Sequence, residues 1–221
     1  MIFQHEQVRQ LAIELPGAIA VFHRHDVDFT AHGAMTLGEA LMQVPPEKRA
    51  AINDDLAGLG DTVGGEVASA DLIRHVLGPY HATQRAEFMN AILIARSVER
   101  RYWDRSECPV GLARALKGLN EDLDLHQISE ESGLFRHLCD NPAAARSGSI
   151  HAMMREHAHM VRHLESIRRL AHNYVAPDDA CPEWRELYAA CRKLDADLRF
   201  HVDLEDNRLF PRFISAQAAA S

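Results

Sequence analysis

A histidine followed four residues later by a glutamate occurs at two matching places in this chain, each at the end of an apolar stripe. His126 pairs in this way with Glu130, and His201 pairs with Glu205. Because an α-helix turns once in 3.6 residues, residues four apart lie on one face of it. The residues before each pair keep that face, with spacings of three and four: Leu112, Leu116, Leu119 and Leu123, and then Leu187, Cys191, Leu194 and Leu198. Each pair is therefore expected on the core-facing side of a long helix.

A single histidine stands upstream of each pair at almost the same distance. His81 precedes His126 by 45 residues, and His157 precedes His201 by 44. Two similar helical hairpins explain this repeat most simply, with a histidine from the partner helix completing the half-site of each hairpin. Two halves related by a pseudo-twofold axis would supply four imidazoles and two carboxylates, a set that suits two adjacent metal ions.

Glutamates on a core-facing stripe need a compensating charge, because an ionised carboxylate buried without a partner costs several kcal/mol. For one histidine–glutamate pair, a satisfied polar layer inside a plain helical bundle would be the simpler explanation. The repetition of pairs, stripes and upstream histidines favours metal ligation instead. The predicted ligands are His81, His126, Glu130, His157, His201 and Glu205.

The segment around His157 holds several histidines, and only this one shares a helical face with apolar residues such as Met153 and Leu164. The remaining histidines fall beside arginines or on other faces. They are expected at the surface: His151, His159 and His163.

The chain is predicted to be all-α, because no segment alternates apolar and polar residues as a strand does. Proline and glycine divide it into a small helical N-terminal domain over 1–60, a linker over 61–68 and a long helical domain over 69–215. Four helices are expected in that last domain, at roughly 69–103, 110–139, 148–174 and 182–208.

Composition excludes several classes of protein. A net charge of −8 with scattered basic residues disfavours nucleic acid as a partner. No apolar run is long enough for a membrane span, and the first residues lack an export signal. The four cysteines show no CxxC spacing, which favours reduced thiols in the cytoplasm and argues against a thiolate metal site.

Nitrogen and oxygen ligands without thiolate suit iron, manganese or zinc. Two carboxylates shared between two ions favour a di-iron centre over a single zinc ion. If both glutamates bridge, each iron has two histidine nitrogens and two glutamate oxygens, and an oxo or hydroxo bridge adds a fifth ligand. One octahedral position per iron then stays open for a small ligand such as nitric oxide or O₂.

The chain resembles the repair-of-iron-centres family, hemerythrin-like di-iron proteins that respond to nitrosative and oxidative stress. The resemblance covers nearly the whole chain and rests on the segments LAIELPGAIAVFHRHDVDF, PYHATQR, MREH and HVDLEDNRLFPR, together with the HxxxEE motif. It implies an up-and-down four-helix bundle behind a small N-terminal helical domain. It also implies iron ligands at the same six positions that the spacing selects.

Two departures from the family pattern bear on function. The N-terminal cysteine pair of the family is replaced by Thr30 and Ala31, so its thiol chemistry cannot operate here. In this respect the chain is similar to the NorA-like subtype, which binds nitric oxide in the cytoplasm. Gln84 stands where many relatives carry a further histidine.

Asp122 and Glu156 fall at positions where relatives often carry acidic residues. The resemblance implies that they hydrogen-bond the ligands or transfer protons at the centre. The alternative is that both are ordinary surface carboxylates.

The resemblance implies a cytoplasmic stress protein that binds nitric oxide, and either reduces it with electrons from an unidentified donor or helps to repair damaged iron–sulfur proteins. A hemerythrin-type protein that binds or senses O₂ without catalysis is the alternative. A ferritin-like oxidase or iron store ranks last, because its sites are built from ExxH rather than HxxxE.

Overall fold

The computed structural model describes residues 3–15, 17–25, 27, 35–60, 73, 81–140 and 147–219. The chain divides into two compact units, 1–79 and 80–221. Within the described residues all regular structure is helical, apart from one isolated bridge between Gln7 and Thr36. The all-α prediction is confirmed.

The first unit is built from short helices around a small apolar core. They are α1 (Val8–Glu14), α2 (Ala18–Arg24), α3 (Leu37–Met42) and α4 (Pro46–Gly60). A capping box starts α3: the Thr36 hydroxyl accepts from the Glu39 N–H, and the Glu39 carboxylate accepts from the Thr36 N–H. The predicted linker over 61–68 and the replaced cysteine positions, Thr30 and Ala31, lie outside the described residues.

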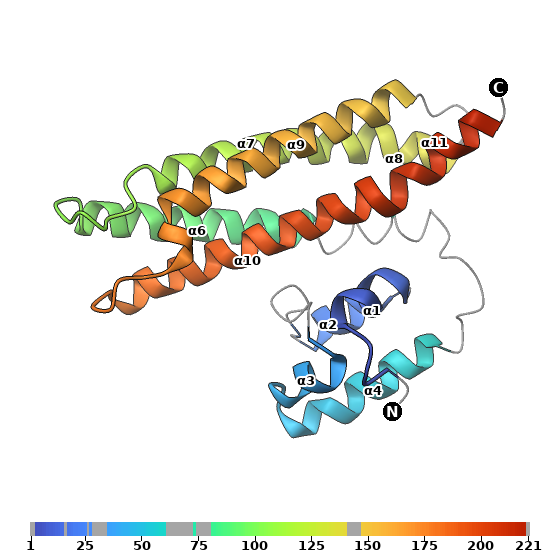
Figure 1. Ribbon diagram of the computed structural model, residues 1–221, viewed down its shortest axis with the longest axis horizontal. Coiled ribbons are helices and arrows are strands. Elements are labelled where there is room, and N and C mark those ends of the chain that lie inside the picture. Colours follow the sequence, from blue (N-terminus) through green and yellow to red (C-terminus); the bar gives the residue numbers. More distant parts are fainter. Residues whose placement is uncertain are drawn as a thin grey trace. The chain divides into compact units, whose positions relative to one another are not determined.

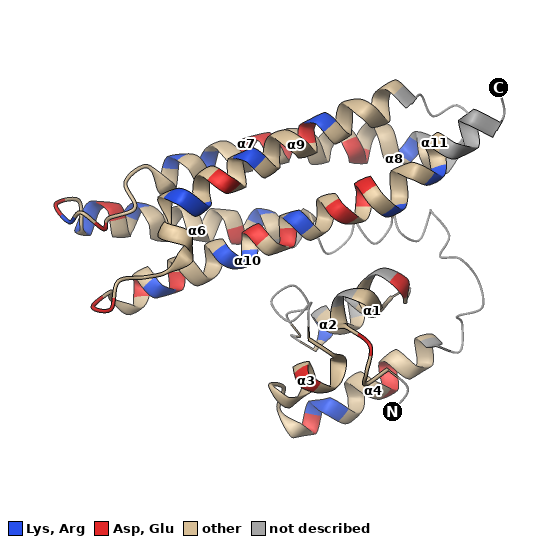
Figure 2. Cartoon of the chain, in the orientation of Figure 1, with Lys and Arg blue, Asp and Glu red and all other residues tan. Residues whose placement is uncertain are grey.

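The second unit is an up-and-down bundle of four long helices, seen side by side in Figure 1. They are α6 (His81–Arg101), α7 (Leu112–Ser129), α9 (Ser147–Leu170) and α10 (Pro182–Leu204). Helix α6 packs against α7 and α10, and α9 packs against the same two helices. Acidic and basic side chains are interspersed along them (Figure 2). None of the described helices combines the length and apolarity needed to cross a membrane.

The apolar stripes predicted from spacing form the core of this bundle. Leu112, Leu119 and Leu123 of α7 are fully buried, as are Leu187 and Leu198 of α10. Since each stripe runs directly into a histidine–glutamate pair, the packing that holds these two helices together also carries both pairs into the interior.

Both stripes end in a π-helical turn that the spacing does not predict. The turns are η2 (Glu130–Leu134) and η5 (Glu205–Leu209), and α8 (Phe135–Asp140) and α11 (Phe210–Ala219) continue from them. In each turn the phenylalanine N–H, five residues on, donates to the glutamate carbonyl. The extra residue per turn resets the helix register, so that both members of each Leu–Phe dipeptide after the turn are buried.

Replacing Leu119 by alanine should lower the free energy of unfolding by about 2–5 kcal/mol, because a fully buried side chain is lost and a cavity remains. Leu125 lies in the same helix and is 68% exposed, so Leu125→Ala is the matched control, with an expected change below about 0.5 kcal/mol. Chemical denaturation of the metal-free protein, followed by circular dichroism, measures both. Equal effects would contradict the orientation of α7.

Candidate metal centre

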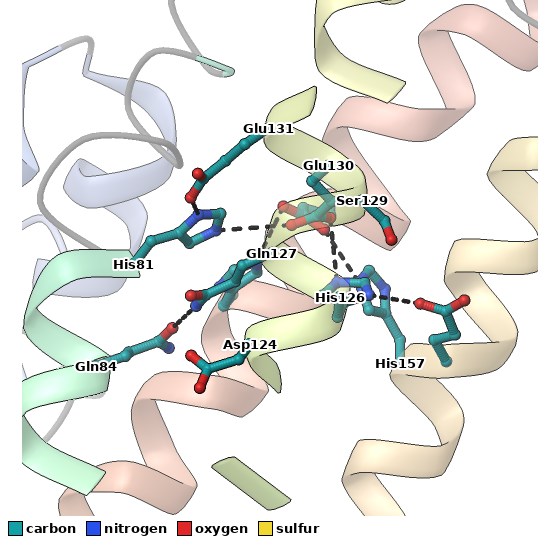
Figure 3. A network of polar contacts seen from close by, with 12 residues as sticks. His81, Gln84, Asp124, His126, Gln127, Ser129, Glu130, Glu131 and His157 are labelled. Carbon is teal, nitrogen blue, oxygen red and sulfur yellow. Dashed lines mark hydrogen bonds and ion pairs between the residues drawn. The ribbon is translucent and has the colours of Figure 1, made fainter. Parts of the chain in front are cut away.

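All six predicted ligand residues lie in the interior of the bundle, and none is more than 2% exposed. His81 begins α6 and His157 lies in α9, while each histidine–glutamate pair spans the junction of a long helix and its π turn. Figure 3 shows His81, His126, Glu130 and His157 converging from three helices. The structure therefore brings together, from four helices, every residue that the spacing selected.

The imidazoles form two pairs, and each pair combines the two sequence repeats. The Nε2 atoms of His126 and His157 are 3.0 Å apart, and the rings of His81 and His201 stack with centroids 5.4 Å apart. The sequence suggests that each hairpin completes its own half-site, and that expectation is wrong. The single histidine of one repeat meets the paired histidine of the other, although the two helices of each hairpin also pack against each other.

Each glutamate reaches both imidazole pairs with different oxygens. Glu130 Oε1 is 3.1 Å from His126 Nε2, and its Oε2 is 3.6 Å from His81 Nε2. Glu205 Oε2 is 3.1 Å from His157 Nε2, and its Oε1 is 2.9 Å from His201 Nε2. A carboxylate in this position can bridge two cations.

These atoms meet the distance requirements of a metal site. With metal–ligand bonds of about 2.0–2.2 Å, neighbouring ligand atoms lie roughly 3.0–3.5 Å apart. Within the described residues, two fully buried groups of ligand atoms each lie within 4.8 Å of one another: one from His126, Glu130, His157 and Glu205, and one from His81, Glu130 and His201. Neither buried oxygen of Glu130 accepts a hydrogen bond from the described residues. The donor set therefore fits metal cations, which would satisfy those oxygens.

Three of the four histidines present their other ring nitrogen to a carboxylate. The Nδ1 atoms of His81, His126 and His157 lie 2.8, 2.9 and 2.7 Å from oxygens of Glu131, Glu156 and Asp206, respectively. A carboxylate at Nδ1 holds the hydrogen on that nitrogen, so that the lone pair of Nε2 faces the centre.

Glu131 and Asp206 are not among the residues that the spacing or the family resemblance selects. The available signal was the acid that follows the glutamate in both copies of the motif. In a regular helix, an acidic residue directly after a buried glutamate is expected on the solvent-exposed side. Here each follows the first residue of a π turn and reaches the lone upstream histidine of its own repeat: Glu131 contacts His81, and Asp206 contacts His157.

The structure separates the two acidic residues for which the family resemblance implies a role. Glu156 contacts His126 directly. Asp122 instead has an oxygen 3.2 Å from His163 Nδ1 and 3.7 Å from His159 Nε2. Both acids line a pocket of about 420 Å³ between α7 and α9, and His126 forms part of its wall.

Gln84, at the position of the additional family histidine, forms a buried pair with a second glutamine. Gln127 Nε2 donates to Gln84 Oε1 at 3.0 Å, and both side chains are buried (Figure 3). The pair joins α6 to α7 beside His81. This position therefore contributes an amide pair and no imidazole.

The two buried carboxylates have opposite electrostatic environments in the metal-free chain. Burial and the neighbouring Glu205 carboxylate raise the pKa of Glu130 well above its usual value. Burial also acts to raise the pKa of Glu205, but His201 and His157 hold it well below its usual value. A proton shared by the pair thus belongs to Glu130.

The imidazoles of His126 and His157 also differ. Burial and the charge of His157 lower the pKa of His126 to about 4. Burial opposes the charge of His157, yet hydrogen bonds to Asp206 and Glu205 raise its pKa to about 9. A cation that binds the centre must displace the proton of His157.

Residues 72–218 match the family described as hemerythrin HHE cation binding domain. The chain is 33% identical to the iron-sulfur cluster repair protein YtfE of Cronobacter sakazakii, over 98% of this chain and all of the relative. It is 31% identical to the probable iron-sulfur cluster repair protein of Haemophilus influenzae, over 97% of this chain and 99% of the relative. The protein YtfE of Escherichia coli O157:H7 is 31% identical over 98% of this chain and all of the relative.

His126→Ala and Glu205→Ala should each lose most of the metal that the chain takes up, because each removes a donor and leaves a buried partner uncompensated. His151→Ala, an exposed histidine of α9, is the matched control and should retain full metal content. Elemental analysis after anaerobic reconstitution with ferrous iron measures this. Full content in either ligand variant would contradict the assignment.

Metal binding at pH 7 should release the proton of His157, since that imidazole is protonated below its pKa of about 9, together with the proton that burial holds on Glu130. Metal affinity should therefore rise as the pH increases toward 9. Calorimetric titration in two buffers of different ionisation enthalpy counts the protons. Asp206→Asn should shift this pH dependence to lower pH, because it removes the carboxylate that raises the pKa of His157. An unshifted profile would argue against this linkage.

Proposed function

This chain belongs to the hemerythrin HHE cation-binding family, and from that premise we propose that it is a cytoplasmic di-iron protein that binds nitric oxide and supports the repair of iron–sulfur clusters. The relatives named as iron–sulfur cluster repair proteins align over almost their full length. Damaged iron–sulfur proteins are the partners that this function requires.

The proposal rests on one observation: each of the two buried glutamates contacts both imidazole pairs. Glu130 and Glu205 each present one oxygen to each imidazole pair. One position is surrounded by donors of His126, Glu130, His157 and Glu205, and the other by donors of His81, Glu130 and His201. A single ion would leave one imidazole pair and two carboxylate oxygens without a partner in the core. Two cations supply the charge that burial of both carboxylates requires.

The donor set favours iron. Imidazoles and carboxylates form a mixed nitrogen and oxygen environment that suits ferrous and ferric iron, and none of the grouped residues is a cysteine. Structural zinc normally takes four ligands in a closed tetrahedron, without carboxylates shared between two ions. Bound ferrous iron supplies open coordination positions and electrons for the binding or reduction of a small ligand.

Residues around the ligands control orientation and access. Glu131, Glu156 and Asp206 hold three imidazoles with Nε2 toward the centre. Glu156 is 51% exposed and lines the pocket, so it connects solvent with the ring of His126. A carboxylate in this position can take a proton from water and hold it beside the centre. Asp122 lies on the same pocket and is a second candidate for this transfer.

Binding or sensing of O₂ is the alternative function. Relatives specialised for O₂ carry more histidines per metal pair than the four grouped here. The amide pair at Gln84 occupies the position where a further imidazole would be expected, which favours nitric oxide. Spectroscopy distinguishes O₂ binding from nitric oxide binding, since reversible oxygenation produces its own charge-transfer band.

Iron-loaded, anaerobically reduced protein should respond to stoichiometric nitric oxide with a change in its Mössbauer and EPR spectra. If the centre turns nitric oxide over, N₂O is released, and Glu156→Gln should slow its formation by roughly tenfold or more, because protons are consumed. Glu121→Gln, an exposed acid of α7, is the matched control and should leave the rate unchanged. A reduced protein that binds O₂ reversibly and ignores nitric oxide would overturn the proposal.

A further inference from the structure

A second group of potential metal ligands lies outside the buried centre, where α7 and α9 face each other. His159 and His163 are one turn apart on α9, and Asp122 of α7 lies opposite them. The side chains of His159, His163 and Asp122 are 52%, 36% and 40% exposed. Sequence spacing assigns both histidines to the surface, and they do lie there. It does not reveal that they share one carboxylate.

The geometry of this group matches that of the buried centre. Asp122 Oδ2 is 3.2 Å from His163 Nδ1 and 3.7 Å from His159 Nε2, and the two imidazole rings lie with centroids 4.4 Å apart. The three donor atoms lie within 4.8 Å of one another. Neighbouring ligands of one transition-metal ion are separated by roughly 3.0–3.5 Å, so small side-chain rotations close the set around an ion.

The pocket links this group to the buried ligands. Asp122 and His159 line it together with Glu156 and His126. Exposure falls from 52% at His159 to 2% at His126, so these residues form a series of nitrogen and oxygen donors from solvent to the centre. An ion needs such a series, because passage through an apolar wall would cost its entire hydration energy.

We propose that Asp122, His159 and His163 form a surface site for a divalent first-row transition-metal ion, from which the ion passes along the pocket to the buried centre. The first part stands on the geometry alone, and the transfer step rests on the proposed function. Three protein donors leave the remaining positions to water, so the ion exchanges faster here than in the closed interior. Arg162 Nη2 lies 3.5 Å from His159 Nδ1, at the outer limit of a hydrogen bond, and leaves His159 Nε2 to the ion.

The test is a titration of untagged, full-length protein with Co²⁺ under anaerobic conditions, followed by visible absorption. His163→Ala and His159→Ala should each lose one equivalent of bound Co²⁺, or weaken it at least tenfold, while the equivalents of the buried centre remain. His151→Ala is the control, because it removes an exposed histidine of the same helix outside the group. Identical binding by wild type and both variants overturns the surface site.

Stopped-flow loading tests the transfer step. In His163→Ala, the buried centre should fill several times more slowly with Co²⁺ at limiting concentration, and to the same final extent. An unchanged filling rate overturns the transfer. The two proposals fail separately: if His163→Ala loses an equivalent and His126→Ala loses none, the surface site stands and the buried di-metal centre does not.

Discussion

The burial of two carboxylates among four imidazoles is the constraint on which the rest of the bundle depends. Glu130 and Glu205 are completely inaccessible. Burial and the Glu205 carboxylate raise the pKa of Glu130, whereas His201 and His157 lower the pKa of Glu205. Burying such carboxylates in a leucine core destabilises the fold unless cations compensate their charge. Each of the four long helices supplies at least one histidine to this site. Bound cations would therefore cross-link all four helices.

The π turns connect the register of the helices to the chemistry of the site. Each begins at a glutamate and inserts one residue before the buried Leu–Phe dipeptide. The insertion lets one short segment serve two purposes, since the glutamate faces the centre while the next acid reaches the outer nitrogen of a histidine. The rings of Phe210 and His157 then stack with centroids 5.8 Å apart, which fixes that imidazole from its face as well as its edge.

The outer carboxylates of His81 and His126 lie in different surroundings. The outer carboxylate of His81 is Glu131, which is also held by an ion pair with Arg85. The outer carboxylate of His126 is Glu156, which lines the pocket between α7 and α9. The outer carboxylates of these two ligands, which belong to the same repeat, thus have different surroundings. The proposed routes of proton transfer and metal uptake both lie on the α7/α9 side.

Spacing along the chain was sufficient to determine the helical class, the core stripes and the six buried ligand candidates. Periodicity is a local property: in a helix, residues three and four apart share a face whatever the rest of the chain does. The stripe through Leu119 and Leu123 therefore placed His126 and Glu130 in the core before any partner helix was known.

Tertiary structure decided how those residues meet. Only the contacts between the rings in the folded bundle show that His81 lies with His201 and His126 with His157. The folded structure was also needed to find the π turns and the outer acids Glu131 and Asp206. The same holds for the position of Asp122 beside His159 and His163. Local spacing determines which face a residue occupies, but the neighbour across that face depends on the relative rotation of helices that are far apart in the chain.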